Sequence, residues 1–141
     1  MAGPTVGLST GRLKFEDFEF RRLASGRCRA KVVLAWGDGR QFVGEAEGVT
    51  SQAGELRCCA VAAVHALEQA VAAKLAFELL GVKAVRAFDA TVVIVLLSAR
   101  EAQTASRLVG SYLSENDPPR GAALAVLNAT NRILGNYFAT R

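Results

Sequence analysis

The 141-residue chain has few of the side chains that usually hold metals or perform catalysis. It contains one histidine, His65, and three cysteines, Cys28, Cys58 and Cys59. A structural zinc site needs about four ligands at suitable spacing, and acid–base or nucleophilic catalysis needs a reactive group with a positioned partner. The sequence shows neither pattern, and we expect His65 at an exposed or edge position of a helix. We therefore expect no metal, no cofactor and no enzymatic activity.

Long apolar runs and export signals are also missing. The longest apolar stretches, residues 91–97 and the alanine-rich stretch after Cys58, are too short or too interrupted to span a membrane. Residues 1–11 are rich in Gly, Thr and Ser, and they lack both the charged and the apolar region of a signal peptide. We expect a flexible leader over 1–11, a single domain over 12–141, and a cytoplasmic location in which the cysteines stay reduced.

The positive charges are unevenly placed, although the net charge of +4 is ordinary for a domain of this size. Five cations crowd one early segment: Arg21, Arg22, Arg27, Arg29 and Lys31. This cluster favours either a patch for an anionic partner or a solvated surface of strands and turns.

Hydrophobic alternation and turn residues divide the first half of the chain into three strands and a helix. The strands are predicted over 13–23, 29–36 and 41–48. The alternation changes parity near residues 16–17, which predicts a β-bulge, and residues 37–39 (Gly-Asp-Gly) predict a hairpin turn. Thr50 and Ser51 offer an N-cap to a helix that we expect to end near residues 80–81.

The second half repeats this order of elements. Its strands are predicted over 82–88, 90–98 and 107–114, with a polar connection over 100–105. Asp117 followed by Pro118 and Pro119 predicts the start of a second helix. Asn131 falls in the apolar stripe of that helix, where we expect its amide to be hydrogen-bonded internally.

Similar residues recur in the two halves, which predicts an internal repeat. Residues 30–34 align with 90–94, residues 43–45 with 109–111, and helix residues 61–71 with 124–134. A unit of about 60 residues is small to fold alone, so the two units should pack together. The predicted fold is α+β, with duplicated βββα units over 12–81 and 82–141. We expect pseudo-twofold symmetry and antiparallel sheets packed on two long helices.

The first predicted helix carries a stripe of small residues beside its broad apolar stripe. The small residues are Cys59, Ala62, Ala66, Ala70 and Ala73. Small side chains allow a close neighbour, so we expect the sheet on one side of this helix and the second helix or a partner subunit on the other. Together with the hydrophobic content of 51%, the stripe predicts a homodimer.

Two segments resemble a known family. Residues 88–94 (Phe-Asp-Ala-Thr-Val-Val-Ile) resemble its "D-A-x-V-x-V" strand, and residues 123–132 (Ala-Leu-Ala-Val-Leu-Asn-Ala-Thr-Asn-Arg) resemble its "A-x-x-A-x-x-x-A-L-N" helix. The family is the C-terminal regulatory domain of alpha-isopropylmalate and citramalate synthases. The resemblance implies a dimeric allosteric module of duplicated βββα units that binds a feedback amino acid. Because the catalytic barrel is absent from this sequence, the module would act on a separate enzyme chain.

The two predicted helix N-termini provide the candidate ligand site. Their free backbone N–H groups and positive dipole ends suit a carboxylate or phosphate, so we expect a small carboxylate metabolite. The candidate ligand residues are Thr50, Ser51, Gln52, Asn116 and Asp117. The alternative is that these residues only cap the helices.

Two further functions stay open. The strands before an alanine-rich helix are also similar to a double-stranded-RNA-binding domain, whose last helix begins with several lysines. Here Glu55 and Arg57 occupy that place, so nucleic acid is the less favoured partner. The other alternative is a protein-assembly module that binds no ligand.

Overall fold

The computed structural model describes residues 13–72 and 74–139, so the predicted leader over 1–11 lies outside the described residues. The first half contains β1 (Leu13–Arg22), the short 3₁₀ helix η1 (Ala24–Gly26), β2 (Arg27–Trp36), β3 (Gln41–Val49) and α2 (Gln52–Ala70). The second half contains β4 (Ala76–Ala87), β5 (Ala90–Glu101), β6 (Thr104–Ser114) and α3 (Pro118–Ala139). The predicted α+β class and the repeated order of three strands and a helix are confirmed.

The strands form two antiparallel sheets of three strands each, in the orders β1-β2-β3 and β4-β5-β6. The predicted bulge in β1 is confirmed by a register shift between Phe15 and Asp17. Gly39 adopts a φ of +96° in the tight turn between β2 and β3, where a residue with a Cβ would be strained. Local turn chemistry therefore sets the hairpin of β2 and β3.

The predicted end of the first helix is wrong, because α2 ends at Ala70 and not near residues 80–81. Ala72 has a φ of 54°, a left-handed conformation that helices commonly adopt where they stop. From Ala76 onward the burial alternates, with Phe77 and Leu79 buried, and the chain pairs with β5. The predicted boundary between units after residue 81 therefore falls inside β4. The polar connection predicted over 100–105 is also shorter, since β5 and β6 extend into it.

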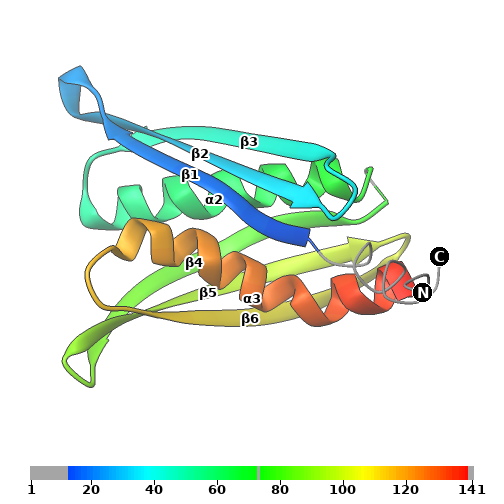
Figure 1. The fold of residues 1–141 in the computed structure, drawn as a ribbon. Coiled ribbons are helices and arrows are strands. Elements are labelled where there is room, and N and C mark those ends of the chain that lie inside the picture. Colours follow the sequence, from blue (N-terminus) through cyan, green and yellow to red (C-terminus); the bar gives the residue numbers. More distant parts are fainter. Residues whose placement is uncertain (1–12, 73, 140–141) are drawn as a thin grey trace, which may run out of the picture.

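Both helices lie between the two sheets (Figure 1). Helix α2 packs against β2 and β3 and also contacts β4, while α3 packs against β5 and β6 and also contacts β1. The two helices contact each other along the middle layer. Fully buried side chains come from every layer: Leu34 of β2, Leu67 of α2, Leu97 of β5 and Val126 of α3. The two halves therefore share one hydrophobic core.

A glycine in each half lets a strand approach its helix closely. A Cβ on Gly44 of β3 would overlap the backbone of Ala62 and Ala66 in α2. In the second half, a Cβ on Gly110 of β6 would overlap the backbone of Ala125 and Ala129 in α3. These are the glycines and helix residues that the sequence repeat aligned with each other.

The aligned strands before these glycines are shifted by three residues from the predicted alignment. Val32 lies opposite Gly44, and Val95 lies opposite Gly110. Ala30 therefore corresponds to Val93, and the sequence pairing of Ala30 with Ala90 is wrong. Segments rich in alanine and valine can be aligned at several registers. Only the pairing of β2 with Gly44 and of β5 with Gly110 shows which alignment is correct.

The small residues of α2 face the chain's own elements. Ala62 and Ala66 lie against Gly44, while α2 also contacts α3 and β4. Ala73, the last member of the predicted stripe, lies outside the described residues. The neighbours on both sides of α2 thus include the sheet and the second helix. The stripe therefore no longer supports the homodimer, which stays a prediction.

None of the helices in the described part of the chain is long and apolar enough to cross a membrane.

Candidate functional site

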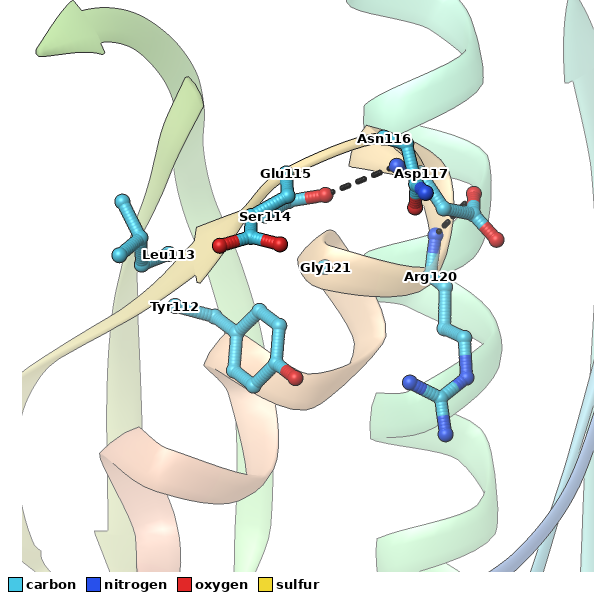
Figure 2. A pocket seen from close by; sticks show the side chains of 8 residues that line it. All are labelled: Tyr112, Leu113, Ser114, Glu115, Asn116, Asp117, Arg120 and Gly121. Carbon is cyan, nitrogen blue, oxygen red and sulfur yellow. Dashed lines mark hydrogen bonds between the residues drawn. The ribbon is translucent and has the colours of Figure 1, made fainter. Parts of the chain in front are cut away.

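A pocket of about 240 Å³ lies where β6 passes into α3 (Figure 2). It is lined by residues 112–117 together with Arg120 and Gly121. In Figure 2 the Tyr112 ring and the Arg120 side chain lie on either side of the first turn of α3. Pockets for drug-sized ligands usually enclose roughly 300–1,000 Å³, so this pocket suits a smaller molecule.

Ser114 and Asp117 fix the loop that forms the pocket. The backbone N–H of Asp117 donates to Ser114 Oγ over 3.0 Å, and the backbone N–H of Arg120 donates to Asp117 Oδ1 over 3.3 Å. The side chain of Asp117 therefore caps α3, as its place before two prolines predicts. Gly121 keeps the first turn close to β6, because a Cβ there would lie 3.2 Å from Ser114 Cβ.

Arg120 supplies the positive charge at this pocket. Its guanidinium lies 5.2 Å from the centre of the Phe15 ring of β1, in a cation–π contact that limits its conformations. Glu115 and Asp117 place carboxylates on the same lining, and Asn116 adds an amide. The site thus offers both signs of charge, which is the pattern that a zwitterionic amino acid would match.

The predicted ligand residues fall into two separate groups. Asn116 and Asp117 line the pocket, whereas Thr50, Ser51 and Gln52 lie at the junction of β3 and α2, outside its lining. Ser51 is the N-cap of α2, and its Oγ accepts a hydrogen bond from the backbone N–H of Gly54 over 3.0 Å. Ser51 therefore caps α2, which is the alternative role expected for it from the sequence.

The arginine cluster is divided between two faces of the first sheet. Arg22 reaches α2 and pairs with Glu55 at 2.7 Å. Arg27 and Arg29 both pair with Glu47 of β3, at 3.4 and 2.6 Å. Arg21 lies beside Arg29 on β1, and Lys31 lies between Glu19 and Glu45 on the adjacent strands. Carboxylates thus accompany four of these five cations, namely Arg22, Arg27, Arg29 and Lys31.

The cysteines and the histidine lie away from the pocket. All three cysteines are buried, and burial raises the pKa of Cys58 to about 12 and also raises the pKa of Cys59. The thiols of Cys58 and Cys59 therefore stay protonated at neutral pH and are poor nucleophiles. His65 is exposed on α2, as predicted, and its Nδ1 lies 2.9 Å from the carbonyl oxygen of Glu45. Within residues 13–72 and 74–139, no group of three or more His, Cys, Asp or Glu side chains could hold a metal.

The amide that bonds α3 to its sheet is Asn128, and the prediction for Asn131 is wrong. Asn131 is exposed. Asn128 Oδ1 accepts a hydrogen bond from the backbone N–H of Ser111 on β6 over 3.1 Å. The helix meets the strand along the face of Ala125 and Ala129, and Asn128 lies at the rim of that face. His65 occupies the corresponding place on α2, beside Glu45 of β3.

The comparisons with known proteins do not assign the chain to a family. No family model matches the chain, and no curated protein matches it.

Sequence reasoning missed Arg120 and Tyr112 as lining residues. One signal could have found Arg120, because a cation in the first turn of a helix opposes the positive end of the helix dipole. Its position three residues after the N-cap Asp117 is therefore unfavourable for the helix alone. No local pattern marks Tyr112, which reaches the pocket only because β6 ends beside α3.

Proposed function

We propose that the chain is a non-catalytic module that forms homodimers and binds a small carboxylate metabolite in the pocket between β6 and α3. The observation that carries this proposal is that Arg120, Asn116 and Glu115 all line one pocket of about 240 Å³. Arg120 would hold the carboxylate of the ligand, because a guanidinium matches a carboxylate with two parallel hydrogen bonds. Glu115 would accept from an ammonium group, so amino acids are the preferred class.

The resemblance to the regulatory domains of alpha-isopropylmalate and citramalate synthases supports the same proposal. It adds that the module regulates an enzyme on a separate chain and that its two βββα units are related by pseudo-twofold symmetry. The paired glycine contacts of Gly44 and Gly110 support such a duplication. The raised pKa values of Cys58 and Cys59 support a non-catalytic role, because these two thiols stay protonated near neutral pH.

Thermal denaturation of the full chain against amino acids and short keto and hydroxy acids tests the ligand. A ligand present at about 100 times its dissociation constant stabilises the folded state by about 2.7 kcal/mol, which is readily measured. We expect a saturable shift with one amino acid or related small acid. If the whole panel leaves the melting temperature unchanged, the binding part of the proposal is wrong.

Matched substitutions then locate the ligand. Asn116→Ala and Arg120→Gln should weaken binding at least about tenfold, as expected for the loss of one polar contact to a charged group. Gln52→Ala, at the N-terminus of α2, and Arg40→Gln, in the turn between β2 and β3, are the controls and should leave binding unchanged. An effect of Gln52→Ala in place of Asn116→Ala would move the site to α2 and contradict this location.

A further inference from the structure

The outer face of the β4–β5–β6 sheet is apolar, and no helix in the described part of the chain covers it. The helices lie on the other face, against the buried side chains of Val93, Val95 and Leu97 (Figure 1). Directly paired residues of antiparallel strands share a face, so the register defines the outer rows. The apolar members are Val85, Val92, Ile94, Leu96, Val109 and Leu113. Of these, Val85 is 40% exposed, Leu113 51% and Val109 67%.

The outer face of the other sheet is built differently. Two of its rows consist of charged residues across β1, β2 and β3: the row of Glu19, Lys31 and Glu45, and the row of Arg21, Arg29 and Glu47. That charged face shows how this chain makes a sheet surface that contacts water. The fold therefore does not require the outer face of the second sheet to be apolar. Extended exposed apolar patches of this kind mark interaction sites.

We propose that this apolar face binds the same face of a second copy of the chain, with the two-fold axis running along β5. This proposal rests on the dimerising part of the proposed function and names the surface that performs it. The dimer is isologous, so each row of one copy meets the same row of the other with the β4 and β6 edges exchanged. Two sheets would then pack face to face with aligned strands.

One pair of opposite charges that borders the apolar rows fits this axis. Glu78 of β4 and Arg107 of β6 flank Ser98 of β5 in one row. Rotation about β5 places Glu78 of each copy opposite Arg107 of the other, which gives two symmetric pairs of opposite charge. It also places Lys83 opposite the uncharged Ser111, which is in the row of Ile94.

A two-fold axis across the strands gives a poorer match. Such an axis would place β4 of one copy over β4 of the other. If it passed through the row of Ile94, Lys83 of one copy would face Lys83 of the other. Like charges placed opposite each other in an interface are costly, and they exclude wrong orientations. The axis along β5 is the one that pairs Glu78 with Arg107. The like charges that it brings together are those of Arg100, which lies beyond that row, outside the apolar rows.

The size of the face is sufficient for a reversible dimer. Strands of up to 12 residues, with about 3.3 Å per residue and about 4.8 Å between strands, give a face of roughly 40 by 14 Å. Two such faces bury about 1,100 Å² in all, just above the roughly 1,000 Å² expected of a specific interface. A dissociation constant in the micromolar range is expected, because the area lies at the low end for specific complexes.

Analytical ultracentrifugation of the full chain without ligand tests this proposal. Loading from about 1 to 200 µM should show a reversible monomer–dimer equilibrium, since that range brackets a micromolar dissociation constant. Val109→Glu places a charge in the apolar rows and should weaken dimerisation at least about tenfold. The matched control is Val49→Glu, at a position that is 52% exposed on β3 of the charged sheet, and it should leave the dimer unchanged.

Charge reversal tests the orientation of the axis. Glu78→Arg and Arg107→Glu should each weaken the dimer, and the double variant should restore it, because the exchanged charges again face each other. Circular dichroism of each variant as a dilute monomer separates loss of dimer from loss of fold. A chain that stays monomeric at 200 µM, a dimer that Val109→Glu does not weaken, or a double reversal without rescue overturns the proposal. The ligand experiments on Asn116 and Arg120 are read separately, so failure of either proposal is recognised by itself.

Discussion

Two glycines decide how closely each sheet can approach its helix. At Gly44 and Gly110 the position of a Cβ is occupied by helix backbone, which cannot move away without shifting the whole helix. Gly81 of β4 differs, because a Cβ there would meet no heavy atom within 4 Å. Substitutions at Gly44 and Gly110 therefore test the close contact between strand and helix, whereas a substitution at Gly81 tests only the general effect of a glycine within a strand.

We predict that Gly44→Ala and Gly110→Ala each destabilise the fold by about 3 kcal/mol or more, since the added methyl group overlaps backbone atoms. Gly81→Ala should change stability by less than about 1 kcal/mol. Urea denaturation followed by circular dichroism measures all three. Equal stabilities for Gly44→Ala and Gly81→Ala would show that α2 does not lie against β3 as described.

Ion pairs across neighbouring strands organise the first sheet. The carboxylate of Glu47 accepts hydrogen bonds from the guanidinium groups of Arg29 and Arg27, at 2.6 and 3.4 Å. These bonds, that of Arg29 first, lower the pKa of Glu47 below its ordinary value of 4.5. Both partners are exposed, so the pairs organise the surface and add little to stability.

We predict that the carboxylate of Glu47 titrates below 4.5 in the folded chain and that Arg29→Gln raises its midpoint. A group with a lowered folded pKa stabilises the fold above its unfolded pKa, and this contribution is lost as the pH falls through the folded pKa. Glu47→Gln should therefore reduce the loss of stability below about pH 4.5. NMR titration of the side-chain carboxyl carbon measures the midpoint. Arg40→Gln, whose partner is Asp38, is the control, and an unchanged midpoint in Arg29→Gln would contradict the pairing.

At the scale of the whole molecule, the helices join the two halves. Helix α2 contacts β4 of the second half, and α3 contacts β1 of the first. Leu97 of β5 is fully buried in a cluster that includes residues of both halves. Trp36, the one tryptophan of the chain, is buried in β2 and reports on the first sheet alone. The chain should therefore unfold as one cooperative unit.

We predict that Leu97→Ala lowers the stability of the first sheet as much as that of the second, by about 2–5 kcal/mol. The reason is that the cavity weakens the core that both halves share. Trp36 fluorescence and far-UV circular dichroism should give the same lowered midpoint on heating. A Trp36 midpoint that stays at its original temperature would show that the two βββα units unfold independently.

The sequence by itself determined the features that depend on near neighbours in the chain. Alternation of apolar side chains located the strands, the glycine-rich turn located a hairpin, and Ser51 and Asp117 were recognised as helix caps. The repeat aligned Gly44 with Gly110 because a glycine within a strand is a strong local mark. These features follow from backbone sterics and from side chains reaching backbone groups a few residues away.

Only the tertiary structure decided the features that join distant residues. The stretch 76–81 has apolar residues that fit a helix or a strand, and pairing with β5 made it a strand. Glu47 pairs with two of the predicted surface arginines only because β3 lies beside β2. Arg120 and Tyr112 line one pocket because β6 ends against α3. Register and packing depend on the free energy of the whole core, which no local pattern records.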